Sequence, residues 1–167
     1  DSAAESAREG FRIDQRMAAA VALEPERALL RLWSRPQTGL SFGRYHRLPD
    51  HGLVQRRSSG GRVVPVGPGV LGLTLAVASA DWLAIGGPAL RPDQILNRAL
   101  RPLLTGLRAL GVDAFYGGRD LVTAQGRALA YATFCPFADG VLVVDQLLAV
   151  STSFSELGRL SSELDPG

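Results

Sequence analysis

The chain has 167 residues, of which 46% are apolar and 20% are charged, and this size and composition are typical of one globular domain with a substantial core. The formal net charge is only +2, but all 18 basic residues are arginine, so chemistry that depends on a lysine within the chain is excluded. A single cysteine excludes an internal disulfide, and two histidines without a second thiol give no recognisable zinc spacing.

The N-terminal half predicts a helix followed by short strands. Residues 1–10 are small and polar without an apolar period, so we expect a flexible tail, whereas Phe11–Leu23 carries apolar residues at helical spacing. Proline and glycine then separate segments rich in strand-forming residues, at Ala28–Trp33, Leu40–Tyr45, Leu53–Arg57 and Arg62–Val66. The segment Val70–Ser79 is almost wholly apolar and predicts a central strand covered on both faces.

The C-terminal half predicts a broken helix, more strands and a final helix. Leucines recur near helical spacing in Pro92–Leu110, Pro102 should kink or split that helix, and Gly111 should end it. Strands are expected at Ala114–Tyr116, Leu121–Thr123, Ala128–Phe134 and Val141–Val150, and Ser153 should cap a helix over Phe154–Leu160. Because strands and helices do not alternate regularly, we expect one mixed α/β or α+β domain over residues 1–167 rather than a Rossmann domain.

Composition also limits the partners and the location. The apolar run Val70–Ala78 is too short to cross a bilayer, and the sequence, which begins with Asp1, shows no signal peptide, so we expect a soluble protein without membrane contact. The small net charge, with no basic stripe interleaved with aromatic residues, argues against nucleic-acid binding. The single cysteine fits a reducing, cytoplasmic setting, and no metal site is expected.

The segment Arg56–Arg62, which reads RRSSGGR, is the most informative in the chain. Paired glycines allow backbone N–H groups to approach an anion closely, and flanking arginines supply charge-assisted hydrogen bonds to a phosphate or carboxylate. The segment therefore predicts an anion-binding loop, although a basic hairpin turn with solvated arginines would have the same composition.

Two other nucleotide-binding signatures do not apply. The pattern G-x-x-x-x-G-K needs a lysine, so the chain has no P-loop. The segment Gly67–Gly72 matches G-x-G-x-x-G, but the residues after it predict a strand where a dinucleotide site needs the N-terminus of a helix.

Several segments, taken in order, resemble the lipoate-ligase branch of the biotin/lipoate protein ligase family. They are the helix Ile13–Ala18, the strands Leu30–Trp33 and Ser41–Tyr45, the RRSSGG loop, Gly118–Leu121, Gly126–Thr133 and Gly140–Val144. The resemblance spans most of the chain. It implies the class II synthetase-like catalytic-domain fold, in which helices flank a mixed sheet.

The resemblance also implies a chemistry. In such ligases the carboxylate of lipoate or octanoate attacks the α-phosphate of ATP, with magnesium, and the resulting acyl-adenylate passes its acyl group to a lysine of a lipoyl-acceptor domain. Ligand contacts are then expected from Arg56, Arg57, Ser58, Ser59, Gly60, Gly61, Arg62, Arg119, Asp120 and Ala128.

The chain departs from the family pattern at three places. The family lysine aligns with Ala128, or with Arg127 if the register slips by one residue, and only Arg127 would retain a cation. Val66 and Gly67 replace a histidine and an aspartate, and the Gly118–Leu121 segment lacks the family asparagine. Full ligases also usually continue beyond the point that corresponds to Gly167. Two hypotheses follow: a divergent ligase with impaired activity, or a non-catalytic pseudoenzyme that binds the acyl ligand or acts as a scaffold, with a partner subunit completing the site.

Cys135 suggests a further alternative, because some relatives transfer octanoyl groups through a cysteine thioester without ATP. Those relatives place the nucleophile before the lysine strand, whereas Cys135 follows it. His46 and His51 are candidate bases, and a buried, inert thiol remains the simpler interpretation. Trp33 and Trp82 are expected to pack in the core or at its rim.

Overall fold

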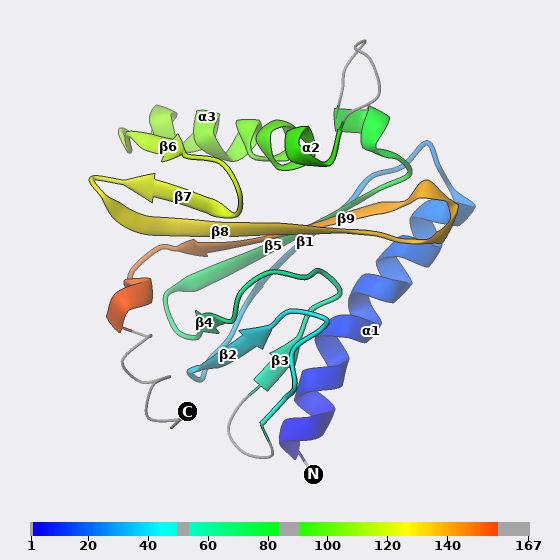
Figure 1. Ribbon diagram of the computed structural model, residues 1–167, viewed down its shortest axis with the longest axis horizontal. Helices are drawn as coiled ribbons and strands as arrows, with labels where there is room; N and C mark the ends of the chain where they lie inside the picture. The colour runs from blue at the N-terminus through cyan, green and yellow to red at the C-terminus, as the bar shows by residue number, and fades with distance from the viewer. Residues whose placement is uncertain (1, 50–53, 84–90, 157–167) are drawn as a thin grey trace.

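A computed structural model describes residues 2–49, 54–83 and 91–156 of the chain (Figure 1). Its centre is a six-stranded antiparallel sheet with the strand order β1-β5-β9-β8-β7-β6. The strands, in that order, are Leu29–Ser34, Val70–Val77, Leu142–Ala149, Arg127–Pro136, Leu121–Ala124 and Ala114–Tyr116. The expected mixed α+β architecture is confirmed, and the predicted central strand β5 lies between β1 and β9.

A second, three-stranded sheet lies on one side of the large sheet, together with the first helix, α1 (Figure 1). Strand β2 (Gly39–Phe42) pairs in parallel with β3 (Val54–Arg56) and antiparallel with β4 (Val64–Val66). The helices α2 (Pro92–Ala99) and α3 (Arg101–Ala109) cover the opposite face of the large sheet. Two short 3₁₀ turns, Ala80–Leu83 and Ala138–Gly140, complete the described elements.

Helix α1 begins earlier than the apolar period indicates. It spans Ser2–Leu23, so the expectation of a tail over residues 1–10 is wrong for residues 2–10. Residues 2–10 are rich in alanine, which has the highest helix propensity. The spacing of apolar residues indicates only which turns of a helix are buried, so it does not detect an exposed helical turn. The buried stripe falls on the second half of the helix, where Met17, Ala18 and Val21 pack against β5 and β9.

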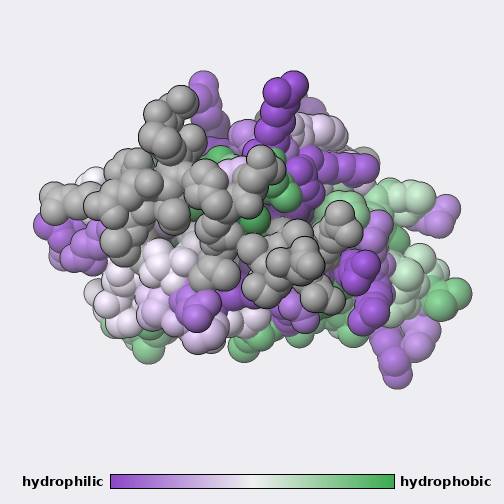
Figure 2. All heavy atoms as spheres, turned by 90° about the horizontal axis from the view of Figure 1, so that it is seen from below, coloured by the Kyte–Doolittle hydropathy of each residue, from purple (hydrophilic) through white to green (hydrophobic). Residues whose placement is uncertain are grey.

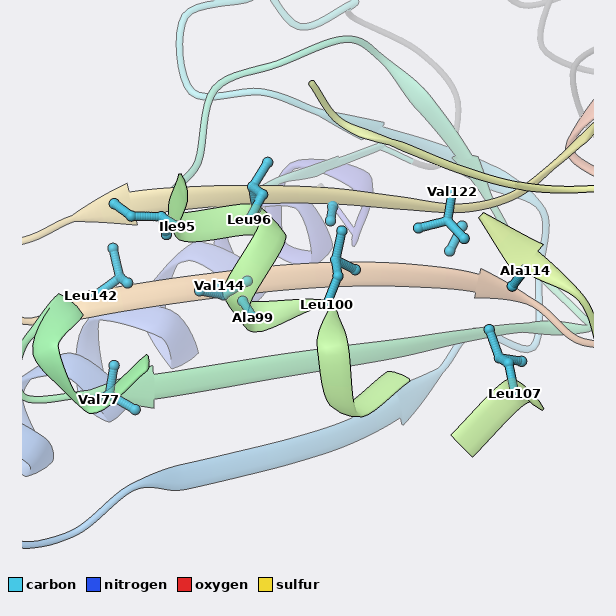
Figure 3. Close-up of a cluster of buried hydrophobic side chains, with 12 residues drawn as sticks. Val77, Ile95, Leu96, Ala99, Leu100, Leu107, Ala114, Val122, Leu142 and Val144 are labelled. Carbon is cyan, nitrogen blue, oxygen red and sulfur yellow. The ribbon is translucent and has the colours of Figure 1, made fainter. Parts of the chain in front are cut away.

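The predicted break in the helix after Pro92 is confirmed. α2 ends at Ala99, and Pro102 occupies the first turn of α3, where its missing N–H costs no helical hydrogen bond. Leu100, at the junction, is fully buried in the largest core cluster, which lies between these helices and the sheet (Figure 3). Ile95, Leu96 and Leu107 pack there against residues of β5, β7, β8 and β9.

The end of the described chain matches the predicted cap. The backbone N–H of Glu156 donates to Ser153 Oγ at 3.1 Å, and the Glu156 carboxylate accepts from the Ser153 N–H at 3.0 Å, which forms a capping box. Residues 154–156 are helical, and the rest of the predicted final helix lies outside the described residues. None of the helices in the described part of the chain has the length and apolar character required to cross a membrane.

Candidate functional site

The predicted anion-binding segment is the connection between β3 and β4, and it folds back over the large sheet. Backbone hydrogen bonds tie it to the end of β2, from the Arg57 N–H to the Phe42 carbonyl at 3.0 Å and from the Arg44 N–H to the Ser59 carbonyl at 2.9 Å. Figure 2 shows the molecule from below relative to Figure 1, and hydrophilic and hydrophobic residues both appear on that face. We call residues 57–63 the ligand loop.

Arg57 is buried, with 4% of its surface exposed, and its side chain lies beneath the ligand loop and binds the loop's carbonyl groups. Its guanidinium makes five hydrogen bonds: to the carbonyl and hydroxyl of Ser41, twice to the Gly60 carbonyl, and to the Arg62 carbonyl. A guanidinium has five N–H donors, so this arrangement leaves none for a ligand. Burial lowers the pKa of Arg57, and the charges of Asp145 and Asp120 oppose that shift.

The next two residues of the loop are each held by an aspartate from a different layer. Ser58 donates to Asp14 Oδ2 of α1 from its backbone N–H at 3.3 Å and from its hydroxyl at 2.9 Å. Ser59 Oγ donates to Asp145 Oδ2 of β9 at 3.0 Å and lies 2.7 Å from Thr133 Oγ1 of β8. These three partners, Asp14, Thr133 and Asp145, come from elements that are far apart in the sequence.

The hydrogen bonds at Asp145 have a fixed direction. Trp33 Nε1 can only donate, and it contacts Thr74 Oγ1 at 3.2 Å. Thr74 Oγ1 in turn donates to Asp145 Oδ1 at 2.9 Å. With Ser59 donating to the other oxygen, Asp145 accepts a hydrogen bond on each side, and these bonds favour its ionised form against the burial that raises its pKa.

Asp14 and Asp145 form a buried pair of interacting acids. Burial, followed by the negative charge of Asp145, raises the pKa of Asp14 from 3.8 to about 7, against the opposing effect of its bonds to Ser58. Burial also raises the pKa of Asp145, although hydrogen bonds from Thr74 and Ser59 oppose that rise. Arg31 of β1 supplies positive charge to both acids, and among the described residues its buried Nη1 atom has no hydrogen-bond partner.

Two glycines allow the ligand loop to approach its neighbours. A Cβ on Gly43 would lie 2.7 Å from the Gly61 carbonyl oxygen and 2.9 Å from the Gly60 carbonyl carbon. Gly61 has a φ of 88°, and a Cβ there would lie 2.9 Å from Thr133 Cγ2. Within the described residues, no protein acceptor binds the backbone N–H of Gly60 or Gly61, and Gly61 is exposed.

The structure brings together two segments that the sequence singled out separately. Arg62 of the ligand loop forms a bidentate ion pair with Asp120, at 2.7 and 2.9 Å, across 58 residues of sequence. The guanidinium carbon of Arg62 also lies 5.4 Å from the ring centroid of Tyr131. Arg119 is exposed, and its carbonyl accepts a hydrogen bond from Tyr116. The fourth predicted arginine, Arg56, donates to the Arg44 carbonyl.

The two candidates for the lysine position differ in their surroundings. Ala128 is half-buried and packs with an apolar cluster that contains Val64, Val66 and Leu147. Arg127 is exposed and lines a separate cavity with Ser153, Ser155 and Glu156. Neither position places a cation on the ligand loop.

Cys135 has the surroundings of an inert thiol. It is buried on β8, it contacts Arg44 Nη1 at 4.0 Å and the Pro136 carbonyl, and burial raises its pKa, which disfavours the thiolate. Among the described residues no histidine contacts it: His46 is exposed and packs against Phe42, while His51 lies outside the described residues. Trp33 is half-buried against the sheet, and Trp82 is exposed.

The described residues contain no cluster of three or more histidine, cysteine, aspartate or glutamate side chains that could hold a metal ion. Among the acids near the loop, Asp120 pairs with Arg62, and Asp14 and Asp145 accept hydrogen bonds inside the protein.

Sequence reasoning missed the two aspartates that hold the loop. Each carried a weak signal: Asp14 occupies a position on the buried stripe of α1, and Asp145 interrupts the apolar strand β9. A charged residue inside an apolar strand is rarely buried without partners, so Asp145 could have been identified as part of a polar network. Its partners could not have been identified.

No protein-family model and no curated protein sequence matches the chain. Solved structures do match. A bi-partite lipoate protein ligase from Thermoplasma acidophilum aligns with a TM-score of 0.62 and 17% identity, over 89% of this chain and 61% of that one. Lipoate-protein ligase A bound with ATP gives 0.66 and 15%, over 86% and 63%. The Thermoplasma acidophilum protein Ta0514 with bound lipoic acid gives 0.61 and 14%, over 89% and 68%.

These similarities show that the chain has the fold of the lipoate-protein ligase catalytic domain, as the sequence resemblance implies. The chain spans about 61% of the length of the bi-partite ligase and 63% of ligase A.

Proposed function

We propose that the chain is an acyl-ligand-binding domain of the lipoate-ligase type, which holds lipoate, octanoate or their adenylate on the ligand loop but does not itself form the adenylate. The observation that carries this proposal is the pair of free N–H groups on Gly60 and Gly61, held in place by a buried polar network. Solved structures of the same fold contain ATP in one case and lipoic acid in another, which supports a ligand of this class.

Within the described residues, neither candidate for the lysine position places a cation on the ligand loop, which supports a non-catalytic role. Ala128 packs in an apolar cluster, Arg127 faces another cavity, and Arg57 has no remaining donor. The loss of one preorganised charge donor typically lowers the rate of a reaction by about 10²- to 10³-fold. Transfer to a lipoyl-acceptor domain would then need a partner subunit that supplies the missing group, and one protein of this fold is itself described as bi-partite.

Arg62 is the loop side chain that can move to meet a ligand. It is 51% exposed and its partner Asp120 is 18% exposed. Because the pair is bidentate, a ligand phosphate would compete with Asp120 for the guanidinium. The ligand anion would then receive two backbone N–H groups from the glycines and one guanidinium.

The strands that flank the loop line a cavity that could take the acyl chain. Val54 of β3 and Val66 of β4 line this cavity of about 110 Å³ with Gly39, Gln55 and the residues 35–37 of the β1–β2 connection. Each methylene buried there contributes about 0.8 kcal/mol to binding.

Thermal-shift measurements with lipoate, octanoate, ATP and a stable octanoyl-adenylate analogue test this proposal. Octanoate and the analogue are expected to stabilise the protein, and Gly61→Ala is expected to abolish that stabilisation, because its Cβ would displace the loop from Thr133. The matched control is Gly111→Ala: Gly111 also has a positive φ, of 79°, but no atom lies within 4 Å of the new Cβ.

Both substitutions introduce similar left-handed backbone strain, of about 1–2 kcal/mol, so only the response to ligand separates them. A wild-type protein that responds to none of these ligands, or two variants that bind equally well, would overturn the proposal.

A further inference from the structure

Two consecutive residues of the ligand loop are anchored by acids, and this places negative charge directly behind the proposed anion site. Asp14 holds both the N–H and the hydroxyl of Ser58, and Asp145 holds the hydroxyl of Ser59. Gly60 and Gly61, with their free N–H groups, follow immediately in the chain. The chain length from Ser58 to Gly60 is at most about 7 Å, so an anion on the glycines lies within range of both acids.

We infer that anion binding at Gly60 and Gly61 is coupled to the uptake of a proton by Asp14, so that the ligand loop binds its anion more tightly as the pH falls. This inference rests on the proposed ligand-binding function and concerns the regulation of that same site.

The charged groups around the two acids identify Asp14 as the residue that titrates. Arg31 of β1 faces both acids, Arg57 faces Asp145, and both arginines keep their charge at any working pH. Cys135 of β8 lies near the pair, and burial raises the pKa of its thiol, so the thiol stays neutral. Asp120, which pairs with Arg62, and Glu9 of α1, which acts on Arg31, are the other acids of this region, but only Asp14 and Asp145 contact the serines of the loop.

The hydrogen bonds separate the two acids. Both oxygens of Asp145 accept directed bonds, from Thr74 and from Ser59, and these bonds favour its ionised form. Asp14 receives its two bonds on a single oxygen, from Ser58 alone. The pKa of Asp14, about 7, lies within the physiological range, so a nearby anion can change the fraction of Asp14 that is protonated.

The direction of the effect follows from Coulomb's law. At neutral and higher pH, an ionised Asp14 repels an anion on the loop, whereas the protonated form does not. The bound anion in turn raises the pKa of Asp14, and proton uptake must accompany binding by thermodynamic reciprocity. The 3.3 Å from Asp14 to the Ser58 N–H, the chain span of about 7 Å and about 3 Å from the Gly60 N–H to its acceptor place Asp14 at most about 13 Å from the anion. With an effective dielectric constant near 20, the repulsion changes the affinity by roughly several-fold between pH 6 and pH 8.5.

The experiment is isothermal titration of the protein with sulfate, and then with octanoate, at pH 6.0, 7.0 and 8.5. Neither anion titrates appreciably in this range. The pH 7.0 titration is repeated in two buffers that differ in ionisation enthalpy, since the difference in observed heat counts the protons taken up. Affinity should fall as the pH rises, with uptake of a fraction of a proton at pH 7.0.

Two variants identify the titrating group. Asp14→Asn should bind both anions with the same affinity at all three pH values and without proton uptake. His46→Gln is the control for the exposed histidine near the loop, and it should keep the wild-type pH dependence.

Wild-type binding that is independent of pH and of buffer would overturn the inference while leaving the proposed function intact. A pH dependence that persists in Asp14→Asn, or that disappears in His46→Gln, would assign the proton to another group and overturn it as well. If neither anion binds at any pH, the proposed function fails and the inference fails with it. The buffer comparison uses only the wild-type protein, so it holds even if a variant does not fold.

Discussion

Replacing Arg57 with alanine is expected to lower the free energy of unfolding by about 4 kcal/mol, the largest loss of any single substitution in the loop. The guanidinium is buried and satisfies the carbonyls of Ser41, Gly60 and Arg62. Alanine would leave those carbonyls without their donor and would open a cavity between β2 and the loop. Urea unfolding followed by circular dichroism measures the loss.

The neighbouring arginine is the matched control for this prediction. Arg56 is only half-buried, and one hydrogen bond to the Arg44 carbonyl is its single described partner. Arg56→Ala should therefore cost less than about 1 kcal/mol. Equal losses for the two variants would contradict the structural role of Arg57, and would return it to the ligand-contacting role that the family resemblance implies.

Replacing Asp14 with asparagine is expected to raise the free energy of unfolding relative to the wild type, and to do so more at pH 8 than at pH 4.5. Folding raises the pKa of Asp14 from 3.8 to about 7, so the folded state favours the protonated form. The resulting stabilisation is fully present below about pH 3.8 and is lost as the pH rises through about 7. At about 1.36 kcal/mol per pH unit, the wild type loses up to about 4 kcal/mol from this group.

Asparagine is neutral at every pH and still offers an oxygen to Ser58, so the variant should not show that loss. The free energy of unfolding of the variant minus that of the wild type should therefore be larger at pH 8 than at pH 4.5. Asp113→Asn is the control, since Asp113 is exposed and should give the same difference at both pH values. A pH-independent difference for Asp14→Asn would contradict the buried-acid interpretation.

The elements of the fold could be predicted where a local pattern controls the structure. Pro102 splits the helix after Pro92, the apolar segment from Val70 forms an inner strand, and Ser153 caps the last described turn. The prediction was wrong for residues 2–10, where helix propensity acts without an apolar period. The local pattern also predicted too long a strand at Leu40–Tyr45. Strand β2 ends at Phe42, and Gly43 packs directly against the backbone of the ligand loop.

The sequence singles out the candidate loop, but it does not distinguish the roles of the residues within it. The composition of RRSSGGR indicates anion binding, but two adjacent arginines look alike in sequence, and only the fold buries Arg57 and leaves Arg56 half-exposed. The pairing of Ser58 with Asp14 spans 44 residues, and that of Ser59 with Asp145 spans 86. Contacts of that range depend on how α1 and the small sheet pack against β9, which no local pattern encodes.

The most direct test of the account is a nitrogen-15 NMR titration of the protein with octanoate and with a stable octanoyl-adenylate analogue. The account predicts that the amide resonances of Gly60 and Gly61 move most and shift downfield, because their N–H groups become hydrogen-bond donors to the ligand anion. Unchanged glycine resonances at saturating ligand, or changes confined to other parts of the chain, would contradict the claim that this loop binds the acyl ligand.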